Sequence, residues 1–456
     1  PTDLTRGIFG ADSGELITAS ITNGIPHPSG YPTWLIASRL FARLPIGRTL
    51  AHRYNLFSVL CMSLAMLTLA IACRLQLPKK QSGSSVVSLA AVLTISFTLT
   101  VWSQAIITEV YALNSLMVTL VIVLLAKADK FAMSSGLALI LGLTCGIAMT
   151  THLTSILLLP AVGLLVLSQA RSLLKVVPIF TSGFALGLLP FLLLFWRSGS
   201  HSPVIWGDTS SVSGWWWLVS GSIYRPNLFA VPAADMLSRV QIALLANPLN
   251  ILFLLIPLGA LIGVFCIYVG NDKSRPVSIL PAALLLTAAL YTLYALSYNT
   301  QDWRVFLLPA NLCLALPLAM GLNSLRLKQW SLVLPLLLIA LNLPVLLNSK
   351  TDMTRAEASM VFEQAPAEAI LLTDGRDETV FPIWYFRYAE NQRPDIVVVD
   401  QNLFAFDWYR SRLATQHPSL QAIEVDNLTE FRRQNRQSRP VCEVSLHPFA
   451  LNCTDR

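Results

Sequence analysis

The sequence predicts a polytopic α-helical membrane protein with a small C-terminal α/β domain. Of its 456 residues, 54% are hydrophobic and 12% are charged, whereas an average soluble protein has about 25% charged residues. This composition excludes the soluble classes. Polar residues return after residue 348, where strand and helix patterns alternate. We therefore expect a transmembrane domain over residues 1–348 and a soluble domain over residues 349–456.

Ten apolar segments approach the roughly 20 residues that a membrane span requires. They cover residues 56–73, 86–103, 110–126, 134–150, 153–168, 174–196, 248–269, 279–297, 305–322 and 331–348. Residues 1–55 precede them and form the first loop. The sequence starts without a methionine, and we expect a fragment or a processed form.

Short basic loops follow every second span. They carry Arg74, Lys79 and Lys80; Lys127 and Lys130; Arg171 and Lys175; Lys273 and Arg275; and Arg326 and Lys328. The positive-inside rule places these loops in the cytoplasm. The other loops and the tail then lie outside, in a periplasm or an ER lumen. The outer loops hold Asp12, Glu15, His27, Glu109, His152, Trp206, Asp208, Tyr298, Asp302 and Arg304. Their gathering on one face indicates a site there.

The first loop contains a pair of carboxylates in the sequence Asp-Ser-Gly-Glu. Asp12 and Glu15 are three residues apart, so a helix that starts here presents both on one face. The same spacing is typical of a capping box before an apolar segment. Ionisable residues at a membrane boundary are also candidates for a functional site. Both interpretations remain open at this stage.

A proline-rich segment follows, with the sequence Ile-Pro-His-Pro-Ser-Gly-Tyr-Pro. Its prolines restrict the backbone and exclude a helix, and a stiff loop loses little entropy when it binds a ligand. His27 is therefore either a turn residue or a functional group. Tyr31 either contacts a sugar or phosphate or anchors the chain at the membrane interface.

Other outer residues also have two interpretations. Glu109 opens a span, where a carboxylate favours the helix dipole but also faces the outer side. His152 lies in a three-residue corner between two spans, so it faces the outer cavity or pairs locally. Asp302 and Arg304 either pair with each other or serve a ligand, because an arginine suits a phosphate.

The long outer segment 197–247 contains three consecutive tryptophans at positions 215–217. Tryptophan is common at membrane interfaces. An amphipathic outer helix that lines a lipid entrance is the functional interpretation, and the two are compatible.

The tail predicts a β-α-β-α-β order, which is typical of a small parallel α/β domain. The expected strands are Ile370–Thr373, Ile396–Val399 and Gln421–Val425, and the expected helices are Phe381–Glu390 and Asp407–Gln416. Asp374 and Asp400 follow strand ends, where ligands bind in such sheets, although turn caps are the favoured interpretation.

The cysteines and the basic residues exclude other classes. Cys61, Cys73, Cys145, Cys266 and Cys313 lie in apolar segments as small core residues. Cys442 and Cys453 form a disulfide if the tail is outside the cytoplasm. The sequence lacks CxxC, HExxH, GxGxxG and P-loop motifs, so zinc, dinucleotide and ATP chemistry have no support. Lys and Arg are scattered, which excludes a nucleic-acid partner.

Several motifs, in order, resemble one family. They are Asp12–Glu15, GIPHPSGYP, R-x-N-L-F-S from Arg53, Trp102 with EVYAL from Glu109, the Gly146 and TTH corner, Trp206–Asp208, Y-N-x-x-D from Tyr298, and Trp384 with RPDIVVV from Arg393. Together they resemble the protein O-mannosyltransferase-like membrane family, a GT-C glycosyltransferase family. The chain departs from it at Ser29 and Thr209, where the family has proline, and a span normally precedes the first motif.

The resemblance implies a GT-C-like fold and a polyprenyl-phosphate sugar donor, with mannose as the family's sugar. It implies transfer to a hydroxyl of a protein, glycan or lipid at the outer face of the bilayer. A similar aspartate is the general base in GT-C enzymes, which maps to Asp12. We expect an inverting single displacement, in which Glu15 orients Asp12 or the acceptor and His27 and Arg304 hold the phosphate. Glu109 and His152 would shape the cavity.

The remaining binding candidates are Tyr31, Trp206, Asp208, Tyr298 and Asp302. No cofactor is expected and no metal is required, although Asp12, Glu15 and Asp208 could hold a divalent ion.

Three alternatives remain. Ionisable residues within membranes also mark transport paths, but transporters bind near the midplane, often with inverted repeats, and no repeat is visible. A lipid-linked glycan polymerase or ligase would use similar chemistry. A sensing tail on a membrane anchor is the third, and ten spans exceed what an anchor needs.

Overall fold

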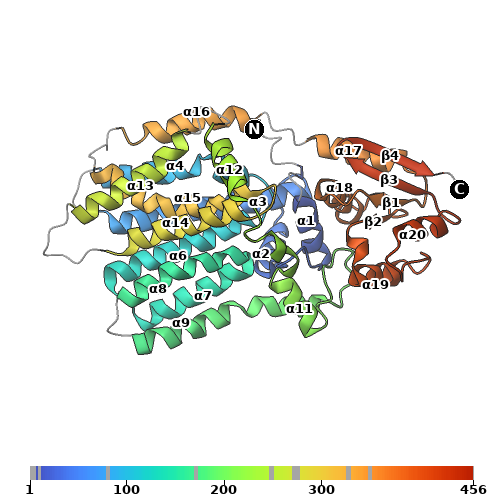
Figure 1. Cartoon of the computed structure of the whole chain (residues 1–456), viewed down its shortest axis with the longest axis horizontal. Coiled ribbons are helices and arrows are strands. Elements are labelled where there is room, and N and C mark those ends of the chain that lie inside the picture. Colours follow the sequence, from blue (N-terminus) through green and yellow to red (C-terminus); the bar gives the residue numbers. More distant parts are fainter. Residues whose placement is uncertain are drawn as a thin grey trace.

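The structure is a computed structural model that describes residues 7–8, 12–78, 83–168, 173–245, 251–269, 278–324, 330–347 and 352–454. A bundle of helices forms one end of an elongated molecule, and a small α/β domain forms the other (Figure 1). This arrangement confirms the predicted fold class. The short helices α1 (Asp12–Thr22) and α2 (Pro32–Ala42) lie between the two parts.

The bundle is built mainly from apolar helices. They are α3 (Leu50–Gln76), α4 (Ser84–Ser96), α5 (Leu99–Ala105), α6 (Tyr111–Phe131), α7 (Ser135–Thr151), α8 (Leu159–Ser168), α9 (Leu173–Gly187), α10 (Leu192–Arg197), α13 (Ile251–Val269), α14 (Leu280–Ser297), α15 (Leu308–Ser324) and α16 (Val333–Leu347). The connections contain α11 (Val212–Val219), α12 (Ala233–Leu245) and the single-turn or 3₁₀ segments η1 (Leu153–Leu158), η3 (Leu189–Phe191), η4 (Ser222–Asn227) and η6 (Trp303–Leu307).

In its described residues, every predicted span overlaps helical structure. Within the described residues, the helices long and apolar enough to cross a membrane are Leu50–Gln76, Tyr111–Phe131, Leu173–Arg197, Leu280–Ser297 and Trp303–Ser324. The pair α4 and α5 is bent by 75° and passes the test as one broken span. Shorter apolar helices cover Ser135–Thr151, Leu153–Ser168, Ile256–Phe265 and Val333–Leu347. The chain is therefore an integral membrane protein, and ten crossings stay a prediction.

The sidedness of the loops also stays a prediction. Lys79, Lys80, Arg171, Lys273, Arg275, Arg326 and Lys328 lie outside the described residues, as does the predicted domain boundary at residues 348 and 349. The first loop is shorter than expected, because α3 begins at Leu50 rather than at residue 56.

Helices α7 and α9 pack closely because both carry glycines four residues apart. A Cβ at Gly142 or Gly146 would overlap the backbone of α9, and one at Gly183 or Gly187 would overlap the backbone of α7. Small residues at this spacing let helix backbones approach in a bilayer, where apolar burial offers little driving force.

The C-terminal domain is a four-stranded mixed sheet with helices around it. Its elements are α17 (Asp352–Gln364), β1 (Ile370–Thr373), α18 (Asp377–Trp384), the π-helix η7 (Tyr385–Ala389), β2 (Val397–Asp400), η8 (Leu403–Ala405), α19 (Asp407–Gln416), α20 (Leu428–Asn435), β3 (Val441–Leu446) and β4 (Phe449–Thr454). The strand order is β2-β1-β3-β4. Strand β1 is parallel to β2 and β3, and β4 is antiparallel to β3.

Strand β1 and helix α19 have the predicted bounds, and β2 starts one residue later than expected. The predicted strand Gln421–Val425 is wrong, because this segment is an irregular loop. Its backbone bonds to the Asn435 side chain, whose Oδ1 accepts from Gln421 N at 3.0 Å, so it does not pair with a strand. The third parallel strand is β3.

The predictions for the described cysteines and for the two turn aspartates agree with the structure. Cys442 and Cys453 face each other on β3 and β4 and form a disulfide. Asp374 accepts from Arg376, and Asp400 accepts from the Leu403 N–H at 2.7 Å, so both act as turn caps. Cys61, Cys73, Cys145 and Cys313 are buried, as expected, while the side chain of Cys266 lies outside the described residues.

Helix α1 fixes the C-terminal domain to the bundle. A Cβ at Gly14 would overlap the carbonyl oxygen of Phe381 on α18, so only glycine allows this approach of α1 and α18. We expect Gly14→Ala to destabilise the protein by roughly 1–3 kcal/mol, which is typical of overpacking. Thermal unfolding of the purified protein in detergent measures the change.

Gly163→Ala on α8 is the matched control, because a Cβ there meets nothing within 4 Å. An unfolding midpoint in Gly14→Ala equal to that of the control would contradict the close contact.

Candidate functional site

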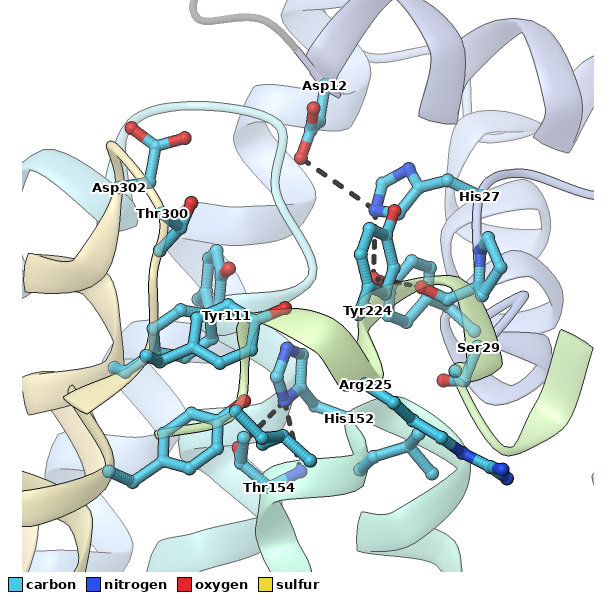
Figure 2. A pocket seen from close by; sticks show the side chains of 18 of the residues that line it. Asp12, His27, Ser29, Tyr111, His152, Thr154, Tyr224, Arg225, Thr300 and Asp302 are labelled. Atoms are coloured by element: carbon cyan, nitrogen blue, oxygen red, sulfur yellow. Dashed lines mark hydrogen bonds and ion pairs between the residues drawn. The ribbon is translucent and has the colours of Figure 1, made fainter. Parts of the chain in front are cut away.

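A cavity of about 370 Å³ lies where α1, the bundle and the C-terminal domain meet. Its wall combines segments far apart in the sequence (Figure 2). The lining residues are Asp12, His27, Pro28, Ser29, Tyr31, Tyr111, His152, Leu153, Thr154, Ile156, Leu157, Trp206, Ser220, Gly221, Tyr224, Arg225, Leu228, Tyr294, Tyr298, Thr300, Asp302, Phe306, Asp377 and Phe381.

The structure brings most of the predicted site residues to this cavity. Those that line it are Asp12, His27, Tyr31, His152, Trp206, Tyr298 and Asp302. Glu15 and Glu109 are buried behind the wall, and Asp208 and Arg304 are not among the lining residues.

His27 is held by the carboxylate of Glu15. The backbone N–H of His27 donates to Glu15 Oε1 at 3.0 Å, and its Nδ1 lies 2.5 Å from Glu15 Oε2. On the other side of the ring, Nε2 lies 2.8 Å from the hydroxyl of Tyr31 and 3.9 Å from Asp12 Oδ2. The Tyr31 hydroxyl in turn donates to the carbonyl of Pro28 at 3.2 Å. The stiff loop is thereby attached to α1 by a connected polar network.

The pKa values of this network follow from burial and charge. Burial opposes a charge on His27, but the carboxylates of Glu15 and Asp12 outweigh it and raise the pKa of His27 to about 10. Burial raises the pKa of Asp12 to about 6, although the charge of His27 opposes the shift. At neutral pH, His27 is therefore a cation and Asp12 is mostly an anion. The side chain of Asp12 is 29% exposed and lines the cavity.

Glu109 and His152 lie deeper in the wall. Burial raises the pKa of Glu109 well above its usual range, and Trp34 Nε1 donates to its backbone carbonyl at 3.2 Å. Burial and the charge of His27 lower the pKa of His152 to about 4, so His152 is neutral. Its Nδ1 lies 2.7 Å from the Thr154 hydroxyl, and its ring stacks near Tyr31.

Asp208 and Arg304 have local partners. Asp208 Oδ1 accepts from the backbone N–H of Ser210 at 3.2 Å and from its hydroxyl. The guanidinium of Arg304 lies 5.6 Å from the centre of the Trp303 ring. In the described part of the chain, Arg304 and Asp302 are not among the ion pairs within 4.0 Å. Of the two interpretations of these residues, the ion pair between Asp302 and Arg304 is therefore not observed, and a role toward a ligand stays a prediction.

The three consecutive tryptophans differ in their exposure to solvent. They lie on α11, where Trp216 is 58% exposed and Trp215 and Trp217 are partly buried. Trp215 Nε1 donates to the carbonyl of Phe191 at 2.9 Å, and Trp217 lies against Phe406 and Trp408 of the C-terminal domain. Trp215 and Trp217 thus have packing partners, and the interface-anchor and lipid-entrance interpretations of this segment stay predictions.

The sequence did not single out several lining residues. Aromatic rings form much of the wall, namely Tyr111, Tyr224, Tyr294 and Phe306. Asp377 comes from α18 of the C-terminal domain, and Arg225 comes from η4. Arg225 lies in the long outer segment 197–247, and Tyr111 lies in the motif EVYAL, so the sequence offered a signal for both. Asp377 had no signal, because only the packing of α18 on α1 brings it here.

A metal site has no geometric support in the residues that the structure covers. They contain no group of three or more His, Cys, Asp or Glu side chains that could hold an ion. Asp208 in particular has its own partner in Ser210 rather than Asp12 and Glu15.

Comparison with known proteins assigns the family. Residues 12–175 match the family described as Protein O-mannosyl-transferase TMEM260 N-terminal domain, and residues 354–443 match TMEM260-associated domain 2. The chain is 25% identical over 508 residues to Protein O-mannosyl-transferase TMEM260 of Mus musculus, covering 97% of this chain and 69% of that protein. It is 22% identical over 504 residues to Protein O-mannosyl-transferase tmem260 of Dictyostelium discoideum, covering 95% of this chain and 60% of that protein.

Solved structures of ArnT from Cupriavidus metallidurans are also similar. The form bound to undecaprenyl phosphate is 12% identical, with a TM-score of 0.40 over 96% of this chain and 89% of ArnT. The apo form is 11% identical, with a TM-score of 0.41 over 97% and 90%. The two family matches and both relatives agree with the motifs, and the chain is a member of the protein O-mannosyltransferase-like membrane family of glycosyltransferases.

Proposed function

We propose that this protein transfers a monosaccharide, mannose in its relatives, from a polyprenyl-phosphate donor to a hydroxyl acceptor. The observation that carries the proposal is the position of Asp12. Its carboxylate lies on the wall of a cavity large enough for a sugar, and its pKa of about 6 leaves it ionised and still basic at neutral pH. A general base works best when its pKa is near the operating pH.

The proposed reaction is an inverting single displacement. The acceptor oxygen attacks the anomeric carbon of the sugar while the bond from that carbon to the phosphate oxygen breaks. The bonding electron pair leaves with the lipid phosphate, and the acceptor proton moves to Asp12. Glycosyl transfer passes through an oxocarbenium-like state, and the negative charge of Asp12 stabilises it.

Glu15 acts through His27 in this scheme. It is fully buried and bonded twice to His27, so it does not reach the substrate. His27 in turn places a positive charge 3.9 Å from Asp12 and limits the rise of the Asp12 pKa. Glu15 is thus a positioning residue for His27, and His27 for Asp12.

The aromatic wall suits a sugar. Tyr294 and Tyr298 stack at 5.2 Å, and Phe306 meets both edge to face. Such rings offer flat apolar faces with hydroxyls at the rim. Asp377 and Phe381 extend the wall from the C-terminal domain, which supports a role for this domain in contacting the acceptor.

The extracytoplasmic face is part of the proposal. Asp12, His152, Trp206 and Tyr298 come from separate loops that the positive-inside rule places outside, and they line the same cavity. One shared cavity is what a one-sided site requires. A transporter would need a path through the bundle, whereas a polymerase or ligase would differ only in its acceptor.

Replacement of the base is the first test. We expect Asp12→Asn to lower release of lipid phosphate from radiolabelled polyprenyl-phosphate mannose by roughly 10²–10⁴-fold. An amide cannot take up the proton of the attacking hydroxyl as a carboxylate does. Purified protein in lipid is the material. Asp235→Asn, an exposed carboxylate in the first turn of α12, is the matched control.

Equal release by Asp12→Asn and the parent would remove Asp12 from the mechanism. Absence of release with any polyprenyl-phosphate sugar, together with flux in sealed vesicles, would favour the transporter.

The pH profile provides a second test. Because the pKa of Asp12 is raised to about 6, its basic form is lost as the pH falls through 6. The rate of release should therefore decrease about tenfold for each pH unit below 6. Above pH 6, the rate of release should stay level until His27 deprotonates near its pKa of about 10. A rate independent of pH between 4 and 7 would contradict this assignment.

A third test addresses the pair of Glu15 and His27. Glu15→Gln removes the largest influence that raises the pKa of His27, while burial still lowers it. The pKa of His27 should therefore fall well below 10. Nuclear magnetic resonance of ¹³C- and ¹⁵N-labelled histidine measures it directly, with Glu363→Gln on exposed α17 surface as the control. Full protonation of His27 at pH 9 in Glu15→Gln would show that Glu15 does not hold its charge.

A further inference from the structure

The cavity has two chemically different sides. Figure 2 shows Asp12 and Asp302 on one side and Arg225 on the other, with Tyr111 and Tyr224 between them. Asp377 is a third carboxylate among the lining residues. A ligand that carries an anion at one end therefore has a preferred orientation here.

Arg225 is the cation on the second side. Of the described lining residues, it alone is an arginine or lysine. Its guanidinium donates to the Ser220 hydroxyl at 3.1 Å. Among the residues with described positions, none of the ion pairs within 4.0 Å involves Arg225. Its remaining donors are thus free for an anion, and a guanidinium matches phosphate oxygens in a bidentate manner.

Other nearby cations are already engaged. Arg239 donates to the backbone carbonyls of Ala295, Leu296, Tyr298 and Thr300. Its guanidinium also lies over the Trp303 ring, as does that of Arg304, and neither arginine lines the cavity. His27 is occupied by Glu15 and Tyr31.

Ser29 lies on the same wall and is the second observation. It is 2% exposed, and its hydroxyl has no hydrogen-bond partner within the described structure. A buried hydroxyl without a partner is destabilising. A hydrogen bond from the Ser29 hydroxyl to a ligand oxygen would therefore offset this free-energy cost. Figure 2 shows Ser29 between His27 and Arg225.

Apolar side chains continue from Arg225 to the surface. Leu153, Ile156 and Leu157 of η1 line the cavity, together with Leu228 beside η4. Ile156 is 51% exposed and Leu228 is 43% exposed. An isoprenoid chain in the bilayer could therefore reach the cavity over these side chains while its phosphate meets the guanidinium.

We propose that Arg225 and Ser29 bind the phosphate of a polyprenyl-phosphate ligand, whose isoprenoid chain leaves over Ile156 and Leu228. The assignment rests on the proposed function for the identity of the ligand. It orients the donor, because the phosphate lies at the Arg225 side and the sugar extends toward Asp12. The opposite orientation would place the phosphate among Asp12, Asp302 and Asp377.

Direct binding tests the assignment without turnover. Radiolabelled polyprenyl phosphate is titrated onto the purified protein in detergent, with folding checked by thermal unfolding. Arg225→Gln should weaken binding roughly ten- to hundredfold, which is the usual effect of losing hydrogen bonds to a charged group. Arg225→Lys should restore part of the affinity, and Ser29→Ala should weaken binding by about fivefold.

Arg304→Gln is the discriminating comparison, because Arg304 is equally cationic but lies over Trp303. Weaker binding in Arg304→Gln with unchanged binding in Arg225→Gln would overturn the assignment. Competition distinguishes the ligand classes: farnesyl phosphate should displace the probe, and inorganic phosphate at the same concentration should not. Equal displacement by inorganic phosphate would indicate a simple anion site and overturn the lipid assignment.

The two proposals can fail separately. If the parent protein binds polyprenyl phosphate and Arg225→Gln binds it equally well, only this assignment fails. If the parent binds none, the proposed function fails with it. In a turnover assay, Arg225→Gln should raise the KM for the donor. The pH at which the rate of release falls, which reports the pKa of Asp12, should remain near 6 as in the parent protein.

Discussion

The buried carboxylate of Glu15 is the constraint on which the site depends. A carboxylate that is fully removed from solvent is costly unless a partner compensates its charge. His27 supplies both a backbone N–H and a ring nitrogen to it. Since Glu15 lies on α1 and His27 in the proline-rich loop, the pair fixes that loop against the helix. The other ring nitrogen then points to Tyr31 and Asp12, which lie on the cavity wall.

The same helix connects the site to the C-terminal domain. Gly14 allows α18 to approach α1 so closely that a single methyl group would disturb the contact. One residue before it, the Ser13 hydroxyl donates to the carbonyl of Thr108 at 2.8 Å. Helix α1 therefore contacts the bundle through one side and the C-terminal domain through another. Because α1 and α18 are in close contact, Asp12 and Asp377 reach the cavity from neighbouring helices.

The sequence predicted the parts of this arrangement that composition and local pattern determine. Apolar length identified the helical segments, and the charges of short loops collected Asp12, His27, Tyr298 and Asp302 without any structural information. Their proximity in one cavity follows because these loops meet at one end of the bundle.

Tertiary packing determined what the sequence did not predict. The family resemblance implied that Arg304 holds a phosphate, and that role stays a prediction. Its side chain lies over the neighbouring Trp303, whereas Arg225 is among the residues that line the cavity. The local sequence pattern predicted a strand at 421–425, whereas the strand that pairs with β1 on this side is β3. Asp377 reaches the cavity only through the contact of α18 with α1, which no local pattern encodes.

The proposed base Asp12 and the cation His27 lie close together, and the protonation state of each depends on the other. Burial alone would raise the pKa of Asp12 and favour its neutral form, which cannot accept a proton. A fully solvated carboxylate, by contrast, would be a weak base. The charge of His27 opposes burial and leaves the pKa of Asp12 at about 6. In the proposed mechanism, Asp12 would accept a proton during transfer and lose it again at neutral pH, which would regenerate the base for each cycle. That balance requires a protonated His27, and the buried Glu15 maintains it.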